Sequence, residues 1–160
     1  MSPSVTLALV TLAAPLAAAF LSVLIPPLRH RGTPAAMLTI LGSLVATGAA
    51  GLLAMEDVAG RAIRATVPWM VVQGRGLGQV GVRLDAVSIP MLGVVCLVAL
   101  AIQVYSVAYM HGETRRSYGR YFAYHAFFLF SMNTLVLAPD LLQAFAGWEL
   151  VGLVLSLIHI

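Results

Sequence analysis

The sequence has 160 residues, of which 61% are hydrophobic and only 9% are charged. Soluble domains are roughly 45–50% apolar and about 25% charged, and a soluble core of this length could not bury so much apolar surface. Disordered chains require the opposite composition, with low hydrophobicity and high net charge. The composition therefore excludes both classes and predicts an integral membrane protein.

The net charge of +3 comes from nine arginines and six acidic residues. The arginines occur in short clusters between apolar runs, whereas a DNA-binding surface requires a single basic stripe, so we expect no nucleic-acid partner. The only cysteine, Cys96, lies within an apolar run. This placement is typical of a small buried side chain and predicts neither a disulfide framework nor a cysteine metal site.

Five long apolar stretches divide the chain. A transmembrane helix needs about 20 predominantly apolar residues to cross about 30 Å of hydrocarbon. On this criterion we predict an all-α integral membrane fold that forms one domain over 1–160. The first stretch lacks a positively charged start, so we expect an uncleaved helix and not a signal peptide. The predicted transmembrane helices cover 5–27, 34–55, 86–109, 121–138 and 141–160.

The loop 56–85 between the second and third helices has the pattern of a short β-hairpin. A β-prone run at 69–72 is followed by glycine-rich turn residues and by an alternating run at 80–85. Glycines at 76–81 match the Gly-x-Gly-x-x-Gly spacing of dinucleotide sites. Such a site requires a helix that begins at the glycines. Because a strand is predicted there, we expect no nucleotide site.

The two short turns between helices carry dense positive charge, from Arg29 and Arg31 in the first turn and from three arginines at 115–120 in the second. Short basic loops are normally cytoplasmic. Helices that alternate in direction place both turns on the same side of the membrane. We therefore expect the N-terminus and the loop 56–85 outside, although this longer loop also holds four arginines.

Glu149 is the strongest candidate for a functional residue. It lies nine residues after Asp140, about 13 Å into the fifth helix and thus near the middle of the bilayer. A carboxylate at this depth is costly and is expected to face the bundle interior or a hydrated cavity. Ala146 and Gly152 on the same face would permit close approach of another helix. Glu149 is suited to take up and release a proton; the alternative is a protonated structural glutamate.

His125 is the second candidate, because imidazole exchanges protons near neutral pH. It would act as a proton relay or, alternatively, as a polar anchor close to the membrane surface. Asp85, with Ser88 three residues later, is expected to cap the third helix. We expect no metal site and no nucleophile–base pair. The remaining polar residues of the spans are expected to hydrogen-bond between helices, namely Gln103, Ser131, Asn133 and Thr134.

Segments in the second half of the chain occur in an order that resembles a known family. They are RLDAVSI at 83–89, YSVAYMH at 105–111, RYFAY at 120–124, FSMNTLVLAPD at 130–140 and GWELVGL at 147–153. This order resembles the N-terminal part of subunit L of the proton-translocating NADH–quinone oxidoreductase, respiratory complex I, whose mitochondrial counterpart is subunit 5. The resemblance covers about 80–154, and Gly-Trp-Glu-Leu-Val-Gly is its most specific part.

The resemblance implies an N-terminal fragment of a larger, antiporter-like helical bundle in the membrane arm of complex I. It implies that Glu149 takes part in proton translocation and pairs with a lysine on a later helix. NADH, FMN, iron–sulfur clusters and quinone would bind elsewhere in the complex, with no cofactor in this chain. The resemblance further implies a multi-pass protein of the bacterial inner membrane, with lipid and other membrane-arm subunits as partners.

Two other functions are compatible with the sequence. The first is the large subunit of a multi-subunit sodium/proton antiporter, or of a related hydrogenase or inorganic-carbon complex, because these share the core motif. The second is a structural membrane scaffold in which Glu149 transports nothing. From Val154 onward the sequence departs from the family pattern. We therefore expect a truncated or artefactual end there, which leaves a role for His159 unsupported.

Overall fold

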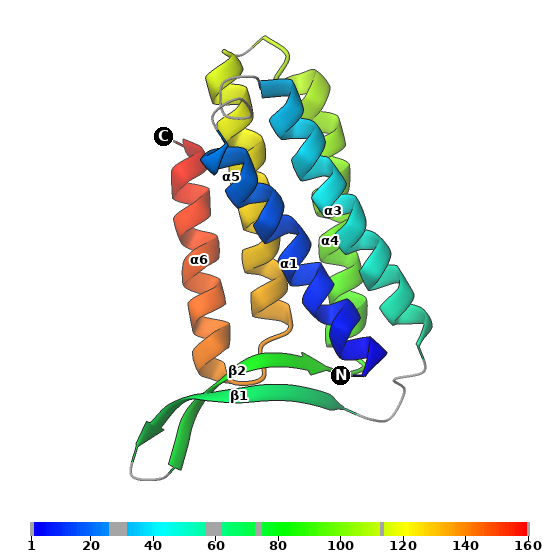
Figure 1. Ribbon diagram of the computed structural model, residues 1–160, viewed down its shortest axis with the longest axis vertical. Coiled ribbons are helices and arrows are strands. Elements are labelled where there is room, and N and C mark those ends of the chain that lie inside the picture. The colour runs from blue at the N-terminus through cyan, green and yellow to red at the C-terminus, as the bar shows by residue number, and fades with distance from the viewer. Residues whose placement is uncertain (1, 26–31, 57–61, 73–74, 113, 160) are drawn as a thin grey trace.

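The computed structural model describes residues 2–25, 32–56, 62–72, 75–112 and 114–159. Within these ranges it contains five helices and one two-stranded sheet. The helices lie side by side, and the hairpin crosses the end of the bundle at which the described chain begins (Figure 1). The elements in chain order are α1 (Pro3–Leu24), α3 (Gly32–Met55), β1 (Ile63–Val72), β2 (Arg75–Leu84), α4 (Ser88–Tyr109), α5 (Arg115–Val136) and α6 (Leu141–His159).

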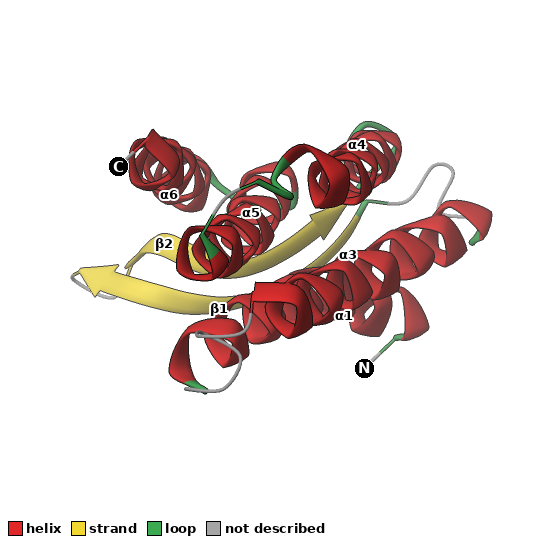
Figure 2. Ribbon diagram, turned by 90° about the horizontal axis from the view of Figure 1, so that it is seen from above, coloured by secondary structure: helices red, strands yellow, loops and turns green. Residues whose placement is uncertain are grey.

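Four of the helices, α1, α3, α4 and α6, are long and apolar enough to cross a membrane. Large apolar side chains cover their outward faces, such as Leu24 at 70% exposure and Leu97 at 61%. The fifth helix, α5, is less apolar. It packs against all four other helices and lies between α4 and α6 when seen along the bundle (Figure 2). Its polar side chains therefore contact protein, and its passage through the membrane stays a prediction.

The largest difference from the predicted boundaries is the start of α5. The charge at 115–120 suggested a loop up to residue 120, but the helix begins at Arg115. Thr114 caps it, since the Thr114 Oγ1 accepts a hydrogen bond from the Ser117 N–H at 3.3 Å. A threonine cap satisfies a backbone donor that the first turn leaves free. The predicted start was wrong because a basic first turn is compatible with a capped helix.

Pro15 leaves a backbone carbonyl of α1 without its helical hydrogen bond, and a side chain from α5 bonds to this carbonyl instead. Proline has no N–H, so the carbonyl of Thr11, four residues earlier, lacks its helical partner. The Asn133 side-chain amide donates to this carbonyl with an N–O distance of 2.9 Å. The buried Cys96 of α4 lies beside the same amide, at 3.6 Å. The interhelical hydrogen bond predicted for Asn133 and the burial predicted for Cys96 are both confirmed.

The predicted hairpin is confirmed, because β1 and β2 pair antiparallel with Gly81 opposite Thr66. Its strands are longer than predicted, since β2 already begins at Arg75, and the turn residues 73–74 lie outside the described residues. The glycine pattern at 76–81 therefore lies in a strand and opens no helix. A Cβ atom at Gly81 would lie 2.0 Å from the carbonyl oxygen of Ala65, so only glycine allows this pairing.

Asp85 and Ser88 hold the junction between the hairpin and α4 in the predicted manner. The Asp85 carboxylate accepts a hydrogen bond from the Ser88 N–H at 2.8 Å, and the Ser88 hydroxyl accepts one from the Asp85 N–H at 2.8 Å. This reciprocal arrangement satisfies two backbone donors at the start of the helix. The predicted cap is confirmed, and it fixes the direction in which α4 leaves the hairpin.

Candidate functional site

The start of α6, the helix that carries Glu149, is fixed on the free edge of β2. The Gln143 side-chain amide bonds both backbone groups of Gly81: it accepts from the N–H at 2.8 Å and donates to the C=O at 2.9 Å. Asp140 accepts from the Gln79 N–H at 2.7 Å. Edge strands leave every second residue's backbone groups unpaired. Here the side chains of Gln143 and Asp140 bond these backbone groups, and these bonds fix the position of the start of α6 along β2.

The attachment of α6 to the hairpin is expected to weaken in acid. The hydrogen bond from the Gln143 N–H, and to a smaller extent the one from the Gln79 N–H, lowers the pKa of Asp140 below its ordinary value of 3.8. A pKa lowered by folding gives stability that is present above the unfolded pKa and is lost as the pH falls through the folded pKa. We expect the amide of Gln79 to lose hydrogen-exchange protection at pH 3 relative to pH 7. Protection factors, which correct for intrinsic exchange, measure this loss.

Asp140→Asn is the control for this expectation. Its amide oxygen still caps α6 but has no charge to lose, so the pH-dependent part of the protection should disappear. Equal protection of the Gln79 amide at both pH values in the unmodified protein would contradict the expectation.

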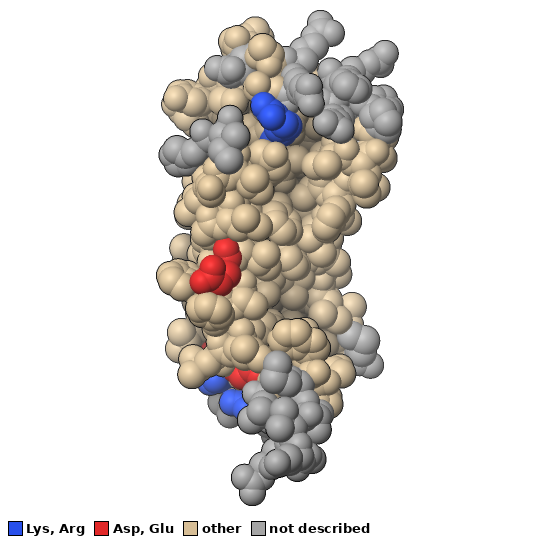
Figure 3. Space-filling view, turned by 90° about the vertical axis from the view of Figure 1, so that its left-hand side faces the viewer, with Lys and Arg blue, Asp and Glu red and all other residues tan. Residues whose placement is uncertain are grey.

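Glu149 lies near the middle of α6, on a face that carries exposed side chains. In the space-filling view of this side, one acidic group lies at mid-height, surrounded by uncharged surface (Figure 3). Glu149 is the acidic residue within α6. The expected depth near the middle of the helix therefore agrees with the structure. Within the described residues the carboxylate is exposed and does not face the bundle interior, which was one of the two expected surroundings; the other, a hydrated cavity, stays a prediction.

Gly147 explains the direction of Glu149. Its Cα is buried against α5, where an added Cβ would lie 2.9 Å from the backbone nitrogen of Leu135. Two residues further along a helix, a side chain has turned by about 200°, so Glu149 faces away from α5. Close helix approach was predicted at Ala146 and Gly152. Both are exposed, and the close contact lies at Gly147.

His125 is buried in α5, between the aromatic rings of Tyr121 and Phe128, whose centroids lie 6.2 Å and 6.1 Å from its own. The structure does not bring it to Glu149. Because Gly147 contacts Leu135, residue 149 lies level with about residue 133 of the antiparallel α5. His125 is eight residues further along, or roughly 12 Å.

The other polar residues of α5 and α4 differ in their partners from the prediction. Ser131 and Thr134 donate to carbonyls of their own helix, at Phe127 and Phe130, with distances of 2.9 and 2.8 Å. Their predicted interhelical bonds are therefore not found. Gln103 is fully buried, and its amide has no hydrogen-bond partner among the described residues. Buried hydroxyls can satisfy themselves on the preceding helical turn, whereas a long amide needs a partner from elsewhere.

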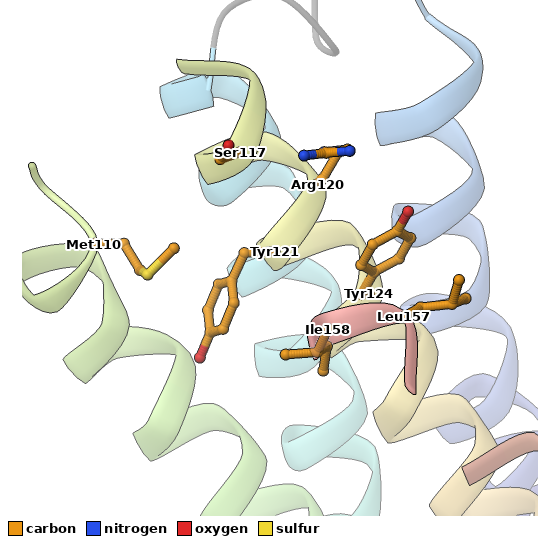
Figure 4. Close-up of a pocket in the computed structure, with 7 residues that line it drawn as sticks. All are labelled: Met110, Ser117, Arg120, Tyr121, Tyr124, Leu157 and Ile158. Carbon is orange, nitrogen blue, oxygen red and sulfur yellow. The ribbon is translucent and has the colours of Figure 1, made fainter. Parts of the chain in front are cut away.

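A polar pocket of about 250 Å³ lies at the end of the bundle remote from the hairpin. Sequence reasoning did not identify it. The available signal was the spacing of Ser117, Tyr121 and Tyr124, which recur three and four residues apart and so share one helix face. The close-up shows that the Tyr121 hydroxyl points towards α4 (Figure 4). The pocket is lined by Met110, Ser117, Arg120, Tyr121, Tyr124, Leu157 and Ile158.

Comparisons with known proteins identify relatives of this chain. Residues 69–122 match the family model of the N-terminus of NADH-ubiquinone oxidoreductase (complex I) chain 5. NADH-quinone oxidoreductase subunit L of Neisseria meningitidis is 38% identical over 86 residues, which are 54% of this chain and 12% of the relative. Subunit L of Escherichia coli K12 is 45% identical over 85 residues, 53% of this chain and 13% of the relative.

A chloroplastic relative extends the match further. NAD(P)H-quinone oxidoreductase subunit 5 of Zygnema circumcarinatum is 34% identical over 115 residues, which are 71% of this chain and 16% of the relative. The matched segments thus span only about an eighth to a sixth of these curated relatives. The family resemblance seen in the sequence is confirmed: the chain is related to subunit L and subunit 5 of NADH–quinone oxidoreductases, and residues 69–122 belong to the N-terminal family of complex I chain 5.

Proposed function

We propose that the protein is a proton-translocating membrane subunit of an NADH–quinone oxidoreductase and couples quinone reduction elsewhere in the complex to proton pumping. The observation that carries the proposal is Glu149, a carboxylate at the middle of an apolar helix within the segment Gly-Trp-Glu-Leu-Val-Gly. The relatives named subunit L and subunit 5 support the family. The proposal assigns NADH, FMN, iron–sulfur clusters and quinone to other subunits.

The exposed position of Glu149 fits an assembled membrane subunit better than an isolated bundle. A carboxylate that faces hydrocarbon is costly, and such groups face other helices or water in functional membrane proteins. The small residues Ala146 and Gly152 flank it on the same exposed face and leave room for a closely packed neighbour. We infer that this face of α6 packs on further membrane helices, and that a cationic side chain there, the lysine implied by the family resemblance, pairs with Glu149.

The proposed location is the bacterial inner membrane, with the N-terminus outside. The end of α4 and the start of α5 lie at the end of the bundle opposite to the hairpin (Figure 1). The arginines at 115–120 belong to that end, and positive charge favours the cytoplasmic side. The hairpin and the start of α1 then lie on the outer side. His125, nearly three turns into α5, would lie closer to the cytoplasmic side than Glu149.

The test is NADH-driven proton pumping in inverted membrane vesicles from cells with and without the gene. Loss of the acidification that NADH drives, with restoration by the gene on a plasmid, is the expected result. A sodium/proton antiporter would instead lose sodium-driven proton exchange, which needs no NADH. A scaffold would leave both activities unchanged once complex assembly is matched. Either of these last two outcomes would overturn the proposal.

A further inference from the structure

Three buried side chains, Ser43, Gln103 and His125, have polar atoms without a hydrogen-bond partner among the described residues, and the last two lie on the neighbouring helices α4 and α5. Gln103 of α4 is 0% exposed, and neither its amide nitrogen nor its amide oxygen is bonded. His125 of α5 is 6% exposed, and its Nδ1 is unbonded. Buried side-chain polar groups are satisfied in the large majority of cases by protein or by ordered water. Both side chains therefore indicate a ligand that completes their hydrogen bonds.

Two contacts fix the alignment of α4 with α5. Near the end remote from the hairpin, the Ser106 and Tyr121 hydroxyls lie 2.8 Å apart and share a hydrogen bond. Nearer the hairpin, the Cys96 Sγ lies 3.7 Å from the side-chain oxygen of Asn133. Because α4 and α5 are antiparallel, the residue numbers of two residues at the same level along the bundle add up to a nearly constant sum. The pair Ser106 and Tyr121 and the pair Cys96 and Asn133 give nearly the same sum. This alignment holds over the whole stretch between them.

Gln103 and His125 lie opposite each other in this alignment. Gln103 is three residues before Ser106, and His125 is four residues after Tyr121, so each is about one turn from the shared hydrogen bond and on the same face of its helix. Viewed along the helix axis, Gln103 also lies between Ser106 and Cys96 around α4. His125 lies in the same way between Tyr121 and Asn133 around α5. The unbonded amide and the unbonded imidazole nitrogen therefore occupy one level of the α4–α5 interface.

A polar route connects this level with the end of the bundle. The Tyr121 ring lies between the pocket and His125: it lines the pocket with Ser117 and Arg120, and its centroid is 6.2 Å from that of His125. Its hydroxyl, bonded to Ser106, points into the α4–α5 interface (Figure 4). Hydroxyl groups thus extend the polar surface of the pocket inward to within one helical turn of Gln103.

We propose that ordered water binds between Gln103 and His125 and exchanges with the solvent through the pocket beside Tyr121. The amide needs both a donor and an acceptor, and water supplies both in one molecule. It also satisfies Nδ1 in either tautomer, because it can donate to the bare nitrogen or accept from the N–H. Buried water typically makes two to four hydrogen bonds, and these two side chains offer three unbonded atoms. The inference is independent of the transport function.

The direct test is a cryo-electron-microscopy map, at about 2 Å resolution or better, of the full protein purified from its native membranes with any subunits that accompany it. The expected result is a water peak within about 3.2 Å of the Gln103 amide and of His125 Nδ1. Buried waters resolved elsewhere in the map show that the map is sensitive enough. A direct amide–imidazole hydrogen bond, or an empty interface in such a map, would overturn the inference.

A pair of variants provides a second readout. Gln103→Leu removes two of the water's partners, so the peak should vanish and the thermal unfolding midpoint should fall, because His125 keeps an unsatisfied buried nitrogen. If no water bound the Gln103 amide, Gln103→Leu would remove an unsatisfied buried amide and would raise the thermal unfolding midpoint instead. That result would contradict the inference. Val104→Leu, at the exposed neighbouring position, is the matched control and should change neither the peak nor the midpoint.

Discussion

Replacement of Glu149 by glutamine in the full-length protein is expected to abolish the proton flux that depends on this subunit. The amide has nearly the shape of the carboxyl group but no proton to release or take up. Glu149 is surrounded by apolar positions at the middle of α6, so no neighbouring carboxylate on the helix can replace it. The measurement is the NADH-driven pH gradient in inverted vesicles, normalised to the amount of assembled complex.

Two variants make the result specific to a titrating group at this depth. Glu149→Asp keeps a carboxylate and should retain part of the flux. Glu56→Gln removes a carboxylate at the hairpin end of α3, where Glu56 accepts a hydrogen bond from the Ser4 hydroxyl, and should leave the flux intact. Wild-type pumping by Glu149→Gln would show that this residue is structural, which is the scaffold alternative.

Features set by local sequence or by the membrane were predicted well. The helices were predicted because a helix in lipid needs about 20 apolar residues, and α1, α3, α4 and α6 are long and apolar enough to cross a membrane. The hairpin was found because alternation of side chains between two faces is a property of the strand itself. The Asp85 cap depends on Ser88, only three residues away. In each case the interaction that decides the structure lies within a short window of sequence.

Features set by contacts between distant elements were not predicted. The carbonyl freed by Pro15 is bound by Asn133, and this bond joins residues 122 positions apart. Of the two glycines in the motif of α6, Gly147 and not Gly152 meets the neighbouring helix, and the spacing of the two does not distinguish them. The direction of Glu149 follows from that choice. A helical period shows which residues share a face, but the packing of α5 decides which face is buried.

The described residues on their own are a poor proton conductor in geometric terms. Conduction requires ionisable groups or water in an unbroken line across the bilayer. Glu149 lies on the outer face of α6, whereas His125 is buried at the α4–α5 interface, roughly 12 Å further along the bundle axis. A hydrogen bond between water molecules covers about 2.8 Å. A chain of several waters, running around α5, would be needed to join the two candidate groups.

Residues 1–160 expressed alone are therefore expected to insert into a membrane without conducting protons. Insertion is expected because the apolar helices satisfy their backbone hydrogen bonds internally, and resistance to carbonate extraction measures it. For conduction, the purified chain is placed in liposomes that contain a pH-sensitive dye, and a membrane potential is imposed. The expected flux equals that of empty liposomes. A higher flux that Glu149→Gln removes would show that the proton path is complete within these helices, and that Glu149 needs no partner from other membrane helices.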